Sequence, residues 1–320
     1  EMIGQTSGAP IPVRKKEVKD GMTLKGPVLT LDVNSRATTT LPIKVQVRDQ
    51  EYVFPSLDDQ LFDPQYGEIG MYNPIKLFAH TQRFVFALDK LDPNKTMVIF
   101  VHGAAGTPRD FKYLVDGLDR TRYQPVFYFY PSGMPLQKLG SLLSDIIKVL
   151  VEDKQFQIKR AVVVAHSMGG LVGLCALNKL CLNGAPAYLK GYISFNTPYG
   201  GVESAKKAIE SAPAVLAAWR DVAPGSSFLE TLYQGSAAGK IPVYLFFSYE
   251  TGKSSDGTIT LQSQLEHKIQ FIASKTYGFN ASHVGILKDD QARQAFYRIL
   301  REMEGDNPLH KKNSPSNHNH

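Results

Sequence analysis

The stretch VVVAHSMGGLVGL, residues 162–174, constrains the fold more than any other part of the chain. Four apolar residues lead to a serine between small residues, and a second apolar run follows. A buried strand that turns sharply into a helix, with Ser167 at the turn, explains this pattern. The small residues Ala165 and Gly169 let the strand and the helix approach such a strained turn. The pattern is typical of the nucleophile elbow G-x-S-x-G with alanine for the first glycine, although an ordinary strand-to-helix loop would also fit it.

Strands and helices are predicted to alternate on both sides of this turn. Apolar runs typical of strands lie at 84–89, 97–103, 125–131, 160–165, 188–196, 241–250 and 267–274, and helical patterns lie at 108–120, 136–153, 168–182 and 290–304. Such alternation predicts an α/β fold with a mostly parallel central sheet and helices on both faces.

The chain is predicted to hold one large domain, residues 66–306, after a small β-rich extension. Residues 1–65 form a lead-in and this extension, with strands at 28–33 and 42–47, and the polar residues 307–320 indicate a disordered tail. The interval 198–240 is too long for a simple connection. Its apolar run AVLAAW forms either a lid or pocket wall, with Trp219 and Leu216 as candidate pocket residues, or a helical excursion packed on the core.

A serine nucleophile needs a histidine base, which follows it in chains built on such an elbow. Between Ser167 and the polar tail the only histidines are His267 and His283. His283 lies in NASHVGIL, after the last predicted strand and just before the last helix, where the base is expected. His267 begins the run HKIQFIAS, which is predicted to be a strand, and a structural or exposed role suits it better.

The acid that orients the base is expected between the serine and the histidine. Asp256 follows the predicted strand 241–250, from where its carboxylate could fix the tautomer of His283, although SDGT would also suit a simple turn. Asp221 is the rival, but it precedes that strand and belongs to the interval 198–240. Two further carboxylates, Asp289 and Asp290, suit the start of the last helix.

Two backbone N–H groups must face the charge that develops on the substrate carbonyl oxygen. One is expected from Met168, at the start of the helix after the serine, where free N–H groups favour negative charge. The other is expected from the turn in FVHGAAGTPRDF, where Ala104 is the candidate donor. His102 in the same turn is then a structural residue.

Composition limits the partners and cofactors of the chain. The net charge is +6, and some of the basic residues lie near the two ends of the chain. These residues form either a solvated face or a peripheral contact with an anionic membrane or envelope surface. No nucleic-acid motif is present. Cys175 and Cys181 are too far apart along one helix for a disulfide and suggest buried free thiols. No cluster has zinc-ligand spacing, so neither metal nor cofactor is expected. The sequence contains no run of about 18 apolar residues, which a membrane-spanning helix would need. The start at Glu1 suggests a processed form, secreted or in the cell envelope rather than cytoplasmic.

Several stretches together resemble the α/β-hydrolase superfamily over residues 66–303. They are IFVHGAAGTPRDF, FYPSGMPL, VVVAHSMGGLV, SFNTPYGG, SSDGTITLQSQL and SHVGILKD. They are similar to bacterial lipase- and esterase-like proteins related to the GPI inositol-deacylase and triacylglycerol lipase groups. The resemblance implies an α/β-hydrolase fold and serine-based hydrolysis of an ester, often a lipid ester, by Ser167, Asp256 and His283. The alternatives are an acyltransferase or thioesterase with the same residues, and a catalytically silent binding protein of this fold.

Overall fold

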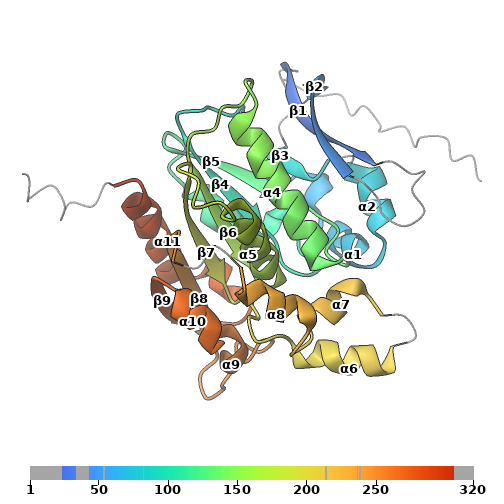
Figure 1. The fold of residues 1–320 in the computed structure, drawn as a ribbon, viewed down its shortest axis with the longest axis vertical. Helices are drawn as coiled ribbons and strands as arrows, with labels where there is room; N and C mark the ends of the chain where they lie inside the picture. Colours follow the sequence, from blue (N-terminus) through green and yellow to red (C-terminus); the bar gives the residue numbers. More distant parts are fainter. Residues whose placement is uncertain are drawn as a thin grey trace, which may run out of the picture.

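A seven-stranded sheet forms the centre of the molecule in a computed structural model, which describes residues 24–33, 43–52, 55–81, 83–212, 215–235, 237 and 239–305. The strands are β3 (Val85–Ala87), β4 (Thr96–Val101), β5 (Tyr123–Tyr128), β6 (Ala161–His166), β7 (Leu189–Phe195), β8 (Val243–Tyr249) and β9 (Lys275–Asn280). Their order is β3-β5-β4-β6-β7-β8-β9 (Figure 1). Strands β4 to β9 are parallel, and only the edge strand β3 is antiparallel. The predicted mostly parallel sheet is confirmed.

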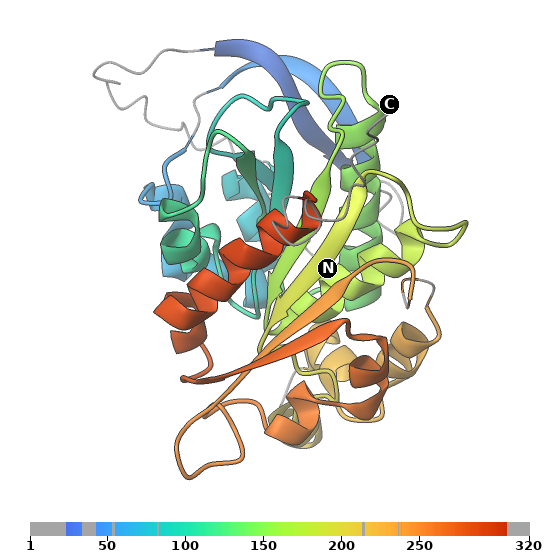
Figure 2. The same cartoon turned by 90° about the vertical axis from the view of Figure 1, so that its left-hand side faces the viewer.

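Helices cover both faces of this sheet, because the side chains of its strands alternate between two apolar clusters. In β4, Met97, Ile99 and Val101 belong to one cluster, and Val98 and Phe100 belong to the other. The first cluster includes residues of α4 (Leu136–Glu152) and α5 (Met168–Leu180), and the second includes residues of α3 (Lys112–Asp116) and α11 (Asp290–Met303). Figure 2 shows α11 across the face opposite to α4. The predicted α/β architecture is therefore confirmed.

The remaining helices lie at the edges of the sheet and above its carboxyl ends. They are α1 (Pro64–Tyr72), α2 (Pro74–Thr81), α6 (Glu203–Ser211), α7 (Ala217–Val222), α8 (Ser227–Tyr233), α9 (Leu261–Gln264) and α10 (His267–Ile272). In its described residues, the interval 198–240 contains three short helices, α6 to α8, with α8 in contact with α5. No helix in the described part of the chain has the length and apolarity that crossing a membrane requires.

The N-terminal extension contains an antiparallel pair of strands, β1 (Leu24–Val33) and β2 (Ile43–Tyr52). These strands include most of the predicted strand residues 28–33 and 42–47. The predicted lead-in before residue 24 and the predicted disordered tail at 307–320 lie outside the described residues. The two cysteines are free and buried, as their spacing predicted.

The predicted strand at 267–274 is wrong, because residues 267–272 form the helix α10 and the final strand is β9. Ile269 and Ile272 pack on the core together with Ala273, whereas Phe271 is 92% exposed. This spacing of three and four residues is helical rather than alternating. Strand β9 lies at the edge of the sheet with most of its residues exposed or half-buried, so its apolar pattern is weak.

Candidate active site

Ser167 occupies a strained turn between β6 and α5. Its backbone has φ 53° and ψ −133°, a region that residues with side chains rarely adopt. The two glycines after Met168 are required by close contacts. A Cβ on Gly169 would lie 2.2 Å from the carbonyl oxygen of His102, and one on Gly170 would lie 1.8 Å from Thr197 Oγ1. These contacts hold the start of α5 against two neighbouring loops, and they leave Ser167 at the tip of the turn.

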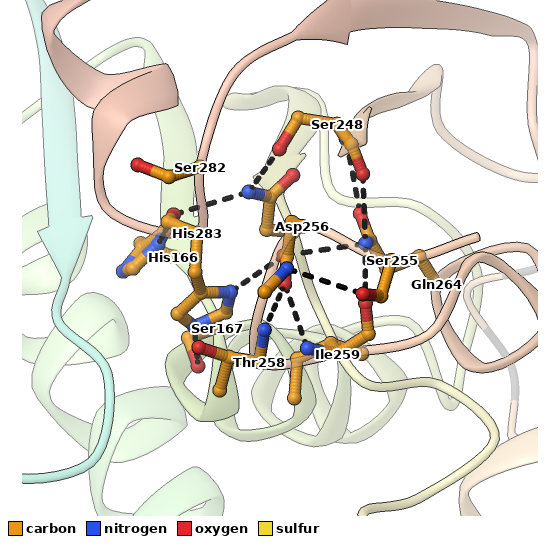
Figure 3. Close-up of polar contacts among 12 residues, drawn as sticks. His166, Ser167, Ser248, Ser255, Asp256, Thr258, Ile259, Gln264, Ser282 and His283 are labelled. Carbon is orange, nitrogen blue, oxygen red and sulfur yellow. Dashed lines mark hydrogen bonds and ion pairs between the residues drawn. The ribbon is translucent and has the colours of Figure 1, made fainter. Parts of the chain in front are cut away.

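Three side chains that are distant in sequence meet at the carboxyl ends of the parallel strands (Figure 3). Ser167 Oγ lies 2.9 Å from His283 Nε2, and His283 Nδ1 lies 2.7 Å from Asp256 Oδ2. Ser167 follows β6, Asp256 lies in the loop after β8, and His283 lies in the loop after β9. The side chain of His283 is 13% exposed, and that of Asp256 is fully covered. The structure thus brings together the three residues that the sequence singles out.

The environment of Asp256 suits an ionised carboxylate. Oδ1 accepts hydrogen bonds from the backbone N–H groups of Thr258 at 2.9 Å and Ile259 at 2.6 Å. Oδ2 accepts from His283 Nδ1 and, at 3.2 Å, from Gln264 Nε2. An ionised carboxylate only accepts hydrogen bonds, so it satisfies all four donors. Nδ1 of His283 then carries a hydrogen, and Nε2 of the neutral ring is free to accept the Ser167 hydroxyl.

The backbone of His283 is held from both sides. Its N–H donates to the carbonyl oxygen of Asp256 at 2.8 Å. Its carbonyl oxygen accepts from His166 Nε2 at 2.9 Å and from Asn196 Nδ2 at 3.1 Å. Asn196 follows β7 with φ 46°, and its Nδ2 also donates to Ser248 Oγ at 2.7 Å. These contacts fix the loop that carries the imidazole.

His166, the residue before the serine, is a neutral hydrogen-bond donor in this arrangement. Burial, with a smaller effect of the nearby His283 ring, lowers the pKa of His166 to about 3. Because Nε2 faces a carbonyl oxygen, it must carry the hydrogen of the neutral ring. Sequence reasoning missed the roles of His166 and Asn196; their only signal is their position, His166 at the end of β6 and Asn196 directly after β7.

The backbone N–H groups of Met168 and Ala104 make no hydrogen bond to any described residue, and the same holds for the neighbouring Gly103 and Gly169. Met168 is the first residue of α5. The loop of Ala104 lies against the serine, since a Cβ on Gly103 would be 2.9 Å from the Cβ of Ser167. Ala105, with φ 52°, anchors this loop by donating from its N–H to Ser132 Oγ at 3.0 Å. Met168 and Ala104 are the donors that the sequence predicts for an oxyanion hole, and this role stays a prediction.

His102, in the same loop, is enclosed. Its Nδ1 donates to the carbonyl oxygen of Gly103 at 2.8 Å, and its Nε2 accepts from the N–H of Tyr130 at 3.2 Å. Burial lowers the pKa of His102 to about 4, so the ring is neutral in the folded protein. Both ring nitrogens are therefore used by backbone groups, as the structural role proposed for this residue requires.

The rival residues have other contacts. His267 lies on α10 with its side chain 82% exposed and 2.5 Å from Glu266. Asp221 accepts from the N–H of Leu136 at 2.6 Å at the start of α4, and burial raises its pKa. Asp289 is the N-cap of α11, and Asp290 accepts from the hydroxyl of Tyr113 at 2.6 Å. None of these contacts joins them to the site of Ser167.

The candidate pocket residues lie on α7 and at its start. Trp219 is half-buried and packs against the first apolar cluster, and Leu216, the N-cap of α7, is also half-buried. Their role in binding an acyl chain stays a prediction. In the described residues, no group of three histidine, cysteine or acidic side chains is arranged to hold a metal ion.

Comparisons with known proteins agree with this architecture. A family model described as the alpha/beta hydrolase family matches residues 98–273. No curated protein matches the chain in sequence. The mature form of the Bacillus licheniformis lipase BlEst2 is similar in structure, with a TM-score of 0.54, 17% identity, and coverage of 68% of this chain and 98% of the lipase. Its propeptide form gives a TM-score of 0.51 and 16% identity, covering 69% of this chain and 53% of that one. At these identities the likeness concerns the fold.

Proposed function

Because the chain belongs to the alpha/beta hydrolase family, we propose that it is a serine hydrolase that cleaves carboxylic esters through an acyl-enzyme intermediate. The observation that carries this proposal is the hydrogen-bonded series from Ser167 through His283 to Asp256, with distances of 2.9 and 2.7 Å. A nucleophile, a base within reach of its proton and a carboxylate that orients the base are the parts that acyl transfer needs.

In the first half of the proposed reaction, Ser167 Oγ attacks the carbonyl carbon of the ester and His283 Nε2 takes the hydroxyl proton. The Asp256 carboxylate, bonded to Nδ1 at 2.7 Å, stabilises the imidazolium that forms. The tetrahedral intermediate then breaks its bond to the alcohol oxygen, which receives the proton from Nε2. The acyl group stays on Ser167.

In the second half, water takes the place of the alcohol. Nε2 of His283 removes a proton from the water as it attacks the acyl carbonyl, and then returns the proton to Ser167 Oγ as the acid leaves. The N–H groups of Met168 and Ala104 are proposed to bind the oxyanion in both halves. Their freedom from other acceptors supports this role, and one such donor contributes about 3 kcal/mol of transition-state stabilisation.

The substrate is proposed to have an apolar acyl chain, as in a lipid ester. Two exposed apolar residues in the segments that carry the acid and the base support this: Val284, which follows His283, is 50% exposed, and Tyr249, at the end of β8, is 38% exposed. The BlEst2 lipase shares the fold, and its activity is transferred to this chain only as part of the proposal.

Labelling with a fluorophosphonate probe tests the mechanism, and a series of p-nitrophenyl esters from acetyl to dodecanoyl tests the substrate. We expect the wild-type protein to be labelled and to hydrolyse the esters, and Ser167→Ala to lose both properties with an unchanged melting temperature. His267→Ala is the control, because its exposed ring lies outside the site. Full turnover by Ser167→Ala would refute the proposal. Formation of a new ester with an added alcohol, instead of free acid, would assign an acyltransferase.

A further inference from the structure

We propose that Gln264 is a positioning residue for the acid of this site: its side-chain amide fixes Asp256 Oδ2, the oxygen that orients His283. The inference rests on the proposed function, because it concerns how the same three residues are held. Gln264 is the last residue of the short helix α9 and is 2% exposed. A buried polar side chain of this length is stable only if its amide is fully hydrogen-bonded.

The amide of Gln264 pairs with the backbone of Ser248 in β8. Oε1 accepts from the N–H of Ser248 at 3.1 Å, and Nε2 lies 3.1 Å from the carbonyl oxygen of Ser248 (Figure 3). A side chain thus makes the pair of bonds that a neighbouring strand would make. This pairing ties α9 to the rigid sheet.

The same amide nitrogen faces the catalytic loop. Nε2 of Gln264 lies 3.2 Å from Asp256 Oδ2 and 3.1 Å from the carbonyl oxygen of Ile259. All the neighbours of Nε2 are acceptors, and the neighbour of Oε1 is a donor, so the amide has one satisfactory orientation. The Gln264 side chain therefore links β8 directly to the Asp256 carboxylate, in addition to the link made by the loop backbone.

Asp256 Oδ2 receives both the Gln264 amide and His283 Nδ1, whereas Oδ1 receives the two backbone N–H groups of its own turn. The turn alone fixes Oδ1 but leaves the carboxylate free to rotate about that side. Gln264 Nε2, which shares its two hydrogens among three acceptors, is the second donor to Oδ2 beside the imidazole, so it restrains the position of Oδ2 independently of His283. Loss of the Gln264 bond should lower kcat more than it changes KM, because the bond affects the orientation of the His283 ring and not the binding of substrate.

Two substitutions separate a positioning role from a packing role. Gln264→Met keeps a side chain of similar length but removes the donor to Asp256, together with the bonds to Ser248 and Ile259. Gln264→Glu gives a buried carboxyl group next to the carboxylate of Asp256. When the introduced group is protonated, it can donate to Asp256 Oδ2 as the amide does. When the introduced group is ionised, it repels the Asp256 carboxylate. Burial and the like charge raise the pKa of the introduced carboxyl, so this change falls in the neutral to alkaline range. The ionisable side chains joined to this network are Asp256 and His283, and His166 is kept neutral by burial.

The experiment measures kcat and KM of folded enzyme from pH 6 to 10, as ratios to wild type at each pH, with the active sites counted by fluorophosphonate titration. Gln262→Glu is the matched control, because it adds the same charge at an exposed position of the same helix α9. We expect Gln264→Met to lose about 30-fold in kcat at every pH with KM within about twofold. Gln264→Glu should stay within about threefold of wild type at pH 6.5 and fall by about tenfold or more by pH 9. Gln262→Glu should follow wild type throughout.

Wild-type kcat in folded Gln264→Met, or a loss in Gln264→Glu that does not change with pH, would overturn the proposal. If only one variant folds, its result decides. If neither folds, Gln264 serves the stability of the fold, and the positioning role is rejected. Wild-type protein that hydrolyses no ester and takes no probe would instead reject the proposed function, independently of these variants.

Discussion

Replacing Asp256 by asparagine should abolish nearly all turnover while leaving the fold intact. Oδ1 accepts from two backbone N–H groups, at 2.9 and 2.6 Å, so the introduced amide must keep its oxygen on that side. Its NH₂ group then replaces Oδ2 and points at His283 Nδ1. The ring can accept this hydrogen only in the other tautomer, which places a hydrogen on Nε2 and prevents it from taking the Ser167 proton.

The expected loss is about 10⁴-fold in kcat, which corresponds to about 5.5 kcal/mol of transition-state stabilisation. The assay is p-nitrophenyl butyrate hydrolysis at pH 7.5, with the melting temperature measured in parallel. Asp221→Asn is the control: its oxygen can still accept from Leu136, 2.6 Å away in the wild type, so kcat should change by less than twofold. If Asp256→Asn stayed within tenfold of wild type, or Asp221→Asn were the damaging change, the assignment of the acid would be wrong.

Three further outcomes are expected. His283→Ala should reduce kcat as severely as loss of the serine, and His267→Ala should leave it within about twofold, with the reverse ranking reassigning the base. Trp219→Ala should lower the melting temperature, because the ring packs on the core, and should flatten the rise in kcat/KM from acetyl to medium-chain esters; an unchanged chain-length preference would remove its pocket role. The pKa values of His102 and His166 are lowered to about 4 and about 3 by burial, so the unfolded chain binds more protons below about pH 6.5. Urea unfolding should therefore show the full free energy of unfolding above that pH. As the pH falls to about 4, the free energy of unfolding should decrease by up to about 1.4 kcal/mol per pH unit for each histidine. This decrease should be smaller in His102→Gln.

The turn at Ser167 could be predicted from sequence because its requirements are local. The apolar strand, the serine and the two glycines stand within ten residues, and each glycine answers a contact that a Cβ would block. The acid and the base could also be predicted, since the order of strands leaves few loops after the serine that lie at the carboxyl ends of the parallel strands. Local patterning was sufficient wherever one segment alone decides the conformation.

The residues that hold these groups could not be predicted in the same way. Gln264 and Asn196 act on segments 8 and 87 residues away, and nothing in their own neighbourhood marks them as buried. The final strand was missed for a related reason: β9 is an edge strand with little apolar pattern, whereas the preceding helix α10 carries Phe271, which is 92% exposed, and so gives a misleading apolar run. Contacts made only after the chain has folded decide these features.

The position of His283 explains why its loop needs so many anchors. Strand β9 is the third neighbour of β6 in the sheet, so at about 4.8 Å per strand the imidazole must reach back about 14 Å to the serine. The loop crosses the ends of β8 and β7 on the way, and each strand supplies an anchor for the backbone of His283. The loop after β8 accepts its N–H, while Asn196 after β7 and His166 at the end of β6 donate to its carbonyl oxygen. Because the strands that carry the base and the nucleophile are this far apart, the 2.9 Å contact between His283 and Ser167 depends on the bonds that fix the crossing loop. Removal of the His166 or Asn196 donor should therefore lengthen this contact and leave the serine turn itself unchanged.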